Sequence, residues 1–301
     1  MSVAQLESAE IQLEAPSGLW SDAWRRLIRN PGALVGFGLV TLFVLTAIFA
    51  PLIAPYDPRE TDVSLVTDGC CPGPSADHWF GVDQLGRDEF SRVVYGARFS
   101  LLIGVVAVSV GVSIGLLLGS LSGFFGGKTD SVIMRLMDIM LSIPGLLMAI
   151  GIAAMLGPGL FSIMIAIGVV NVPIFARLLR GSVLGQKGND FVLAARAIGV
   201  PRRTILISHI LPNAISPIIV AATLALATAI IDAAGLGFLG LGPQDPSTPE
   251  WGTMLTDTVR YLQTAPHLAI IPGVAIVISV LGFNLIGDGL REALDPKLRG
   301  R

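Results

Sequence analysis

Residues 190–213 read DFVLAARAIGVPRRTILISHILPN, a polar, arginine-containing segment that separates two long apolar runs. These runs occupy residues 160–176 and 214–241. Within the segment itself, apolar residues recur at helical spacing and are followed by a glycine and a proline. The segment is therefore expected to be a short helix that ends abruptly, between two much longer apolar helices.

The composition of the whole chain indicates a membrane protein. Hydrophobic residues make up 52% and charged residues 14% of the 301 positions, and the polar residues gather between apolar segments. A soluble core has no use for that segregation. A helical span needs about 20 apolar residues, and runs of about that length cover residues 33–54, 101–125, 139–156, 160–176, 214–241 and 268–286. We predict an all-α, polytopic membrane protein with six transmembrane helices, the third and fourth forming a tight hairpin.

The distribution of basic residues predicts the orientation. If the N-terminus is cytoplasmic, the outer segments hold five basic residues, Arg59, Arg87, Arg92, Arg98 and Arg260, which leaves 15 of the 20 inside. The positive-inside rule then places both termini in the cytoplasm. The first apolar run is too long and starts too late for a cleavable signal peptide. The net charge of −2 argues against nucleic acid as a partner.

The segment before the first span has an apolar helical face, made of Leu19, Trp20, Ala23, Trp24, Leu27 and Ile28. Two interpretations stay open: a helix lying in the membrane interface, or a simple cytoplasmic extension of the first span. Pro31 permits a break between the two helices.

The largest outer loop, residues 55–100, contains the patterned stretch HWFGVDQLGRDEFSRVVYGARFSL, which we interpret as packing against a partner or a gate. Its adjacent Cys70 and Cys71 are the only cysteines of the chain. Free thiols are expected here because a disulfide between neighbouring residues is strained. A metal site is not expected, since His78 is the only nearby histidine and no second cysteine pair exists.

The sequence gives no sign of a catalytic, cofactor-binding or metal site. None of the three histidines, His78, His209 and His267, lies in a predicted span, and neither an HExxH motif nor a pair of intramembrane carboxylates appears in the sequence. Residues 122–129, SGFFGGKT, have Ser122 where a phosphate-binding loop needs glycine. An intramembrane hydrolase and a nucleotide site in this chain are therefore both disfavoured.

Polar residues inside the spans are few, and Asn171, Asp232 and Asn284 stand out. An acid at the centre of a bilayer costs about 2.5 to 3.5 kcal/mol on insertion scales, so Asp232 is expected to face the bundle interior or water. These residues are candidates for a pathway or gate. For Asp232, a role in bracing helices is an equal alternative.

The short helix predicted at residues 190–198 has one apolar face. Asn189 is the expected N-cap, and the face consists of Phe191, Ala194, Ala195 and Ile198 at positions i, i+3, i+4 and i+7. Gly199 is expected to end the helix. The small residues permit close approach of another protein, and Arg196 lies beside them; an interfacial helix on anionic lipid is the alternative.

The stretch AARAIG at residues 194–199, followed after nine residues by HILPN, resembles the EAA loop of ABC-importer permeases, with Leu193 where the general pattern has glutamate. Four further stretches resemble segments of the dipeptide, oligopeptide and nickel permease family, and in particular its C-type subunit. They are HWFGVDQLGRDEFSRVVYGARFSL, GGKTDSVIMRLMDIMLSIPGLL, LGFLGLGPQDPSTPEWGTML and FNLIGDGLREALDPKLRG. That family usually has glutamate where Asp232 stands.

The resemblance implies a type I permease fold and a role in a heteromeric importer of the bacterial inner membrane. Its partners would be a second related permease, one or two subunits that bind ATP and Mg, and an extracytoplasmic substrate-binding protein. The side chains implied in docking the ATPase are Phe191, Ala194, Ala195, Arg196, Ile198 and Gly199. The chain itself would carry out no chemistry and hold no cofactor.

The expected organisation is a cytoplasmic tail 1–32, a first transmembrane helix 33–54, an extracytoplasmic loop 55–100, a permease core 101–290 with a coupling loop 177–213, and a cytoplasmic tail 291–301. The alternative class is an ion-coupled secondary transporter, which the scarcity of intramembrane charge and of any inverted repeat disfavours. Short peptides are the favoured substrate, with glutathione-like peptides, nickel chelates and haem left open.

Overall fold

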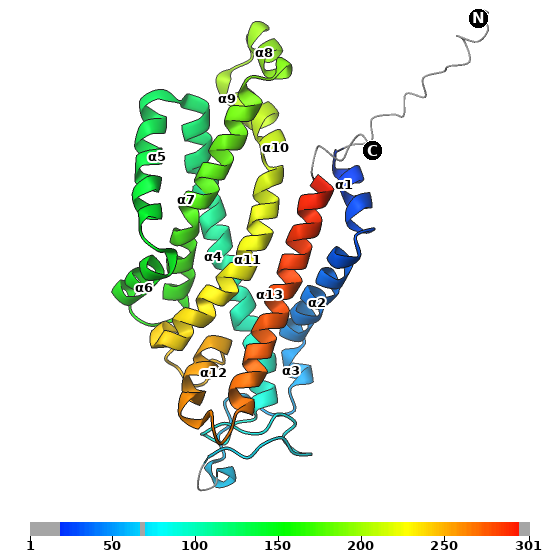
Figure 1. Ribbon diagram of the computed structural model, residues 1–301, viewed down its shortest axis with the longest axis vertical. Helices are drawn as coiled ribbons and strands as arrows, with labels where there is room; N and C mark the ends of the chain where they lie inside the picture. The colour runs from blue at the N-terminus through cyan, green and yellow to red at the C-terminus, as the bar shows by residue number, and fades with distance from the viewer. Residues whose placement is uncertain (1–18, 67–69, 295–301) are drawn as a thin grey trace, which may run out of the picture.

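The computed structural model describes residues 19–66 and 70–294, and the regular structure of these residues is helical. Five of the described helices are long and apolar enough to cross a membrane: α2 (Pro31–Ile48), α4 (Glu89–Phe125), α7 (Leu160–Lys187), α11 (Ser216–Leu236) with η4 (Gly237–Leu241), and α13 (His267–Leu294). They run side by side along the long axis of the molecule (Figure 1). The all-α membrane fold predicted from the apolar runs is confirmed.

The run predicted as a span at residues 139–156 is bent in the structure. The structure has two helices there, α5 (Gly127–Ser142) and α6 (Gly145–Leu156), which meet at an angle of 93°. Proline restricts the residue before it to extended conformations, and Ile143 accordingly has ψ of 130° ahead of Pro144. The chain reaches six crossings when this bent pair counts as one. The predicted turn into α7 holds, since α6 packs against α7 and buries Ala149 and Ala153.

Two long helices extend beyond their apolar runs. The helix α4 begins at Glu89 instead of residue 101, because an Asp88 carboxylate oxygen accepts a hydrogen bond from the Ser91 backbone at 2.7 Å and caps the first turn. The outer loop expected to reach residue 100 therefore ends at Asp88. Likewise α7 continues to Lys187 and takes up the first part of the segment expected as a coupling loop.

The core of the bundle is the contact between α4 and α7, which is built on small residues. A Cβ atom at Gly115 would lie 2.5 Å from the Cβ of Phe175, and one at Gly119 would lie 2.5 Å from the carbonyl oxygen of Ala176. Glycines spaced four apart form a groove along one helix face, and such faces let membrane helices approach closely. This contact positions both ends of α7, including the end that leads to the 190–213 segment.

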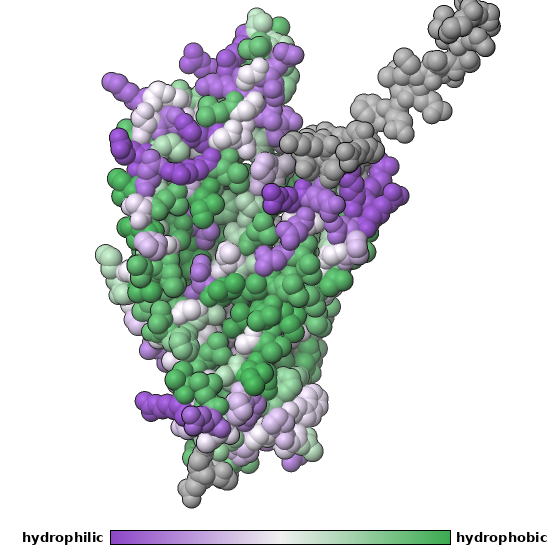
Figure 2. All heavy atoms as spheres, in the orientation of Figure 1, coloured by the Kyte–Doolittle hydropathy of each residue, from purple (hydrophilic) through white to green (hydrophobic). Residues whose placement is uncertain are grey.

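The short helices divide between the two ends of the bundle. The α8 helix (Asp190–Ala197) and α9 (Arg202–Thr204) lie at one end, followed by the π-helical turn η3 (Ile205–Ile210) and α10 (Leu211–Ala214). At the other end lie α3 (Ala50–Ile53), η2 (Val63–Leu65), α12 (Trp251–Thr258) and η5 (Val259–Tyr261). An apolar belt separates the two polar ends (Figure 2), as expected for a protein embedded in a bilayer.

The helix α1 (Leu19–Leu27) is separate from α2 and lies at the α8 end. Ala23 and Leu27 are buried against Ala293 of α13, whereas the Trp24 side chain is 59% exposed. The structure therefore has two helices here, with the break directly before Pro31. The predicted tails at residues 1–18 and 295–301 lie outside the described residues.

Candidate functional site

The α8 helix extends beyond the end of the bundle, where the 190–213 segment connects α7 to α11 (Figure 1). Asn189 is its N-cap residue, as predicted, although its side chain donates to the Gln186 side-chain oxygen at 2.7 Å. Arg196 is exposed, and Arg202 and Arg203 are exposed just beyond the helix. The segment thus presents a short helix with basic residues beside it.

The apolar face predicted for α8 is divided between two surroundings. Phe191, Ala194 and Ile198 are exposed, with Ile198 at 81%. Ala195 is instead buried together with Val192, in the same cluster as Ile205 and Ile210 of η3. The described residues leave the exposed part of the face uncovered, and the buried part fixes the helix to its own bundle.

Gly199 ends α8 as predicted. Its φ of +79° is a left-handed conformation that favours glycine. The Gly199 N–H donates to the carbonyl of Arg196, and the Val200 N–H donates to the carbonyl of Ala195, both at 3.0 Å. These two bonds form a Schellman motif, which satisfies the last carbonyls of the helix.

The connection from α8 to α11 contains a widened turn. In η3, the backbone N–H of Leu211 donates to the carbonyl of Leu206, five residues earlier. Pro212 has no N–H for a regular helical bond, and its ring crowds the preceding carbonyls. The wider turn accommodates this proline, and π-helical turns of this kind are frequent at functional sites.

Ion pairs that the sequence did not reveal fasten α5 to α7 below α8. The Arg180 guanidinium donates two hydrogen bonds of 2.6 Å to the Asp130 carboxylate. Arg177 pairs with Asp138 on the same two helices, and the Lys187 ammonium donates to the carbonyl of Phe124 at 2.8 Å. Together these contacts hold the base from which α8 projects.

The three polar residues predicted for a pathway lie on three different helices. Asn171 is buried in α7, and its side-chain amide donates to the carbonyl of Ile167 at 2.9 Å. A Cβ added at Gly111 of α4 would lie 2.7 Å from the Cβ of Asn171. Its position is that of a packing residue between α4 and α7. Asp232 in α11 and Asn284 in α13 are half-buried, so each can still reach a surface.

The opposite end carries a buried charged cluster that the sequence analysis missed. Arg87 is 2% exposed, and its guanidinium donates to the Asp83 carboxylate at 2.6 Å and to the carbonyl of Pro246 at 2.5 Å. Arg92 donates to the same carbonyl at 3.2 Å. The arginines of the patterned stretch are therefore buried, and they join the loop that contains Asp83 to the loop that contains Pro246.

Glu250 completes this end by capping α12. Its two carboxylate oxygens accept hydrogen bonds of 2.9 Å from the backbone of Gly252 and of Thr253. Burial nevertheless raises the pKa of Glu250, because an ionised carboxylate is costly away from water. The neighbouring Trp251 is fully buried and donates its indole N–H to the carbonyl of Val93 at 3.0 Å. We name Asp83, Arg87, Arg92, Glu250 and Trp251 the outer cap.

The expectation of free thiols at Cys70 and Cys71 is wrong, because the structure joins them in a disulfide. Cys70 has a φ of +79°, and Cys71 is buried beside Ala265 and Leu268. Among the described residues no group of three or more His, Cys, Asp or Glu side chains is arranged to hold a metal ion.

This arrangement, a membrane helix bundle with a projecting helical loop at one end, defines a permease-type membrane protein, and comparison with known proteins gives the family. Residues 115–300 match the family described as the binding-protein-dependent transport system inner membrane component. Residues 18–67 match the N-terminal transmembrane domain of oligopeptide transport permease C. The chain belongs to this family of transport permeases.

Curated relatives agree over nearly the whole chain. The dipeptide transport system permease protein DppC of Alkalihalophilus pseudofirmus is 50% identical over 280 residues, which cover 93% of this chain and 90% of the relative. The glutathione transport system permease protein GsiD of Escherichia coli is 48% identical over 281 residues, covering 93% and 91%. The relatives are thus transport permease subunits of nearly the same extent.

Solved structures show the same fold at low identity. An inward-facing MetNI methionine ABC transporter matches with a TM-score of 0.58 and 22% identity, covering 68% of this chain and 97% of that chain. An amino acid ABC transporter matches with a TM-score of 0.51 and 18% identity, covering 66% and 92%. The bundle therefore has the fold of ABC-transporter permeases.

Proposed function

We propose that this chain forms half of the translocation pathway of an ATP-driven importer of short peptides. The observation that carries the proposal is α8, a short helix at the end of the bundle that exposes Phe191, Ala194 and Ile198. Exposed apolar side chains on a protruding element are typical of a protein contact. The dipeptide permease relative supports the choice of substrate.

The contact proposed for α8 is with an ATPase subunit, which would bind ATP and Mg. Val192 and Ala195 fix α8 to η3, and η3 continues through α10 toward α11. A displacement of α8 would therefore be passed to a membrane-crossing helix without a flexible loop between them. This chain would transmit the movement of α8 to its membrane-crossing helices, and its partner subunits would hydrolyse ATP.

The two ends of the molecule are assigned to the two sides of the membrane, and this assignment suggests where the remaining partners bind. We place the α8 end, with both termini, on the cytoplasmic side of the inner membrane, because most basic residues lie at that end. The outer cap then faces the extracytoplasmic side, where a substrate-binding protein would deliver the peptide. A second, homologous permease would complete the pathway.

Asp232 is the residue we propose for the pathway or gate, because it is half-buried in a crossing helix while Asn171 is fully packed. Replacing Asp232 with leucine should reduce peptide uptake while the assembled complex survives. Normal uptake in Asp232→Leu would remove this residue from the pathway, and failed assembly would make it a brace between helices.

The function is tested by uptake of a radiolabelled dipeptide into cells that contain this chain and its partner subunits. Uptake should stop when the ATPase subunit carries an inactive catalytic site, and it should continue when an uncoupler collapses the proton gradient. The opposite pattern would indicate an ion-coupled secondary transporter. Since the GsiD relative is a glutathione permease, glutathione is the second candidate substrate, and competition between it and the dipeptide separates the two.

A further inference from the structure

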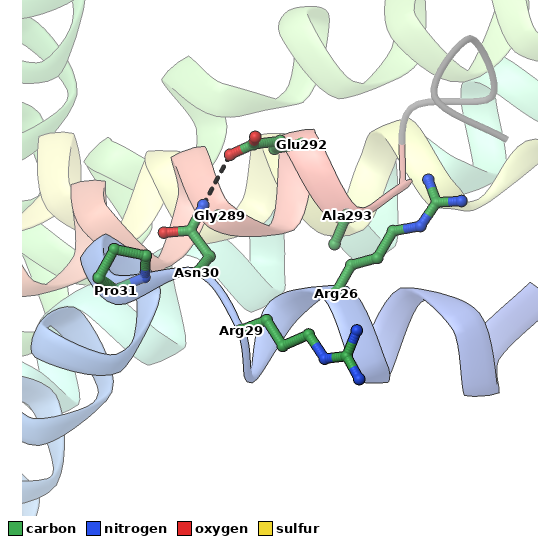
Figure 3. Close-up of a pocket in the computed structure, with 7 residues that line it drawn as sticks. All are labelled: Arg26, Arg29, Asn30, Pro31, Gly289, Glu292 and Ala293. Carbon is green, nitrogen blue, oxygen red and sulfur yellow. Dashed lines mark hydrogen bonds between the residues drawn. The ribbon is translucent and has the colours of Figure 1, made fainter. Parts of the chain in front are cut away.

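A hollow of about 460 Å³ lies where α1 meets the end of α13 (Figure 3). Both elements meet at the α8 end of the molecule (Figure 1). The hollow is open to solvent and has no role in the proposed transport cycle. Its lining comes from the α1–α2 corner and from α13: Arg26, Arg29, Asn30, Pro31, Gly289, Glu292 and Ala293.

The hollow is held in place by close packing on both sides. Ala23 and Leu27 of α1 are buried against Ala293. A Cβ at Gly289 would lie 2.5 Å from the Cβ of Ala33, so the glycine lets α2 begin directly against α13. The Asn30 side chain caps α2 by accepting from the Ala33 backbone at 3.0 Å. The arginines therefore project from a fixed corner of the fold.

The hollow lies at the first residue of α2, and this location indicates its depth in the membrane. The 18 residues of α2 contain no charged side chain, and at 1.5 Å per residue they span about 27 Å, close to the hydrocarbon thickness of about 30 Å. Asn30 and the two arginines immediately precede this run. They consequently lie at the depth of the lipid headgroups.

The chemistry of the hollow favours an anionic group. Among the described lining residues are two guanidinium groups and one carboxylate, that of Glu292, which already accepts a hydrogen bond of 2.6 Å from the Asn30 amide. Elsewhere on α1 and the turn that follows it, Trp24 and Ile28 are 59% and 45% exposed. Amphipathic helices bury such side chains at the boundary between headgroups and acyl chains.

We propose that this hollow binds the phosphate of an anionic phospholipid, with Arg26 and Arg29 as its ligands and Trp24 and Ile28 beside the acyl chains. Arginine binds phosphate through a planar fork of donors. The lipid belongs to the leaflet at the α8 end, which is the cytoplasmic leaflet if the orientation proposed above holds. The binding itself does not depend on the transport function.

The test is native mass spectrometry of the detergent-solubilised complex titrated with phosphatidylglycerol or with phosphatidylcholine of the same acyl chains. The wild-type complex should retain phosphatidylglycerol preferentially. Replacing both arginines, Arg26→Gln with Arg29→Gln, should weaken that retention by about fivefold for each arginine removed. The matched control is Arg25→Gln, which removes one charge from the same helix outside the lining and should leave retention unchanged.

Two further measurements separate the proposal from its alternatives. Glu292→Gln removes the negative charge and keeps an oxygen that can accept from Asn30, so it should tighten phosphatidylglycerol binding, a gain that misfolding cannot produce. Inorganic phosphate should not displace the lipid. Equal losses in the Arg25 variant, equal retention of both lipids, or displacement by inorganic phosphate at millimolar concentration would each overturn the proposal.

Discussion

The α8 end and the outer cap are held together by different kinds of interaction. At the α8 end, two buried apolar side chains, Val192 and Ala195, fix a helix whose other apolar side chains are exposed. In the outer cap, buried charges and a buried tryptophan join loops from distant parts of the sequence. The first construction suits an element that moves against a partner, and the second suits a rigid end that keeps the crossing helices in register.

The largest expected effect follows from removing a charge from the outer cap. Arg87→Ala would leave the buried Asp83 carboxylate without its closest partner, and breaking a buried pair in this way costs about 3 to 5 kcal/mol. We expect loss of the folded permease, measured by thermal unfolding of the purified protein. Arg98→Ala, at an exposed arginine of α4, should change the melting temperature little. Equal melting of the two variants would show that the outer cap does not stabilise the fold.

A smaller loss of stability is expected at the α4–α7 contact, which supports both ends. Gly115→Ala places a Cβ 2.5 Å from that of Phe175, so the helices must move apart, and overpacking of this kind costs about 1 to 3 kcal/mol. Gly38→Ala is the control, because a Cβ at that glycine has no neighbour within 4 Å. If Gly115→Ala melts at the wild-type temperature, the close approach of α4 and α7 is not needed.

The two neighbouring alanines of α8 should fail in different ways. Ala195→Asp introduces a carboxylate into the cluster with Val192 and Ile205, so α8 should detach and become sensitive to limited proteolysis. Ala194→Asp lies on the exposed side and should leave the proteolysis pattern intact while substrate-stimulated ATP hydrolysis falls. Leu193→Glu, which introduces the residue usual in related permeases, should be tolerated. Identical proteolysis of both aspartate variants would refute the division of α8 into two faces.

The smallest effect is expected at the end of α8. Gly199→Val requires a β-branched residue at φ of +79°, a strain of about 1 to 3 kcal/mol that the loop can partly relieve by unwinding. Coupled hydrolysis should fall, and Gly199→Asn should retain most of it, because asparagine tolerates the left-handed region. If Gly199→Val and Gly199→Asn reduced coupled ATP hydrolysis equally, the presence of a side chain would matter and the backbone conformation would not.

The sequence predicted the features that depend on local pattern. The apolar runs predicted the long helices, and the position of Gly199 predicted the end of α8. The division of α8 was not predictable, because Val192 and Phe191 are both apolar and only the packing of η3 decides which one is buried. The outer cap was not predictable either, since Arg87 and Pro246 are 159 positions apart. The angle of 93° at Pro144 was not predictable, because hydropathy measures the length of an apolar run and not its direction.

The exposed face of α8 is expected to contact an ATPase subunit, and site-directed cross-linking tests this contact. Ile198→Cys, in a chain whose Cys70 and Cys71 are replaced by serine, should form a cross-link to the ATPase subunit with a short bifunctional thiol reagent, and nucleotide should change its yield. Thr129→Cys, an exposed position at the start of α5 on the same end of the bundle, is the reference and should cross-link weakly. A cross-link from Ile198→Cys no stronger than that from Thr129→Cys, with or without ATP, would contradict the account.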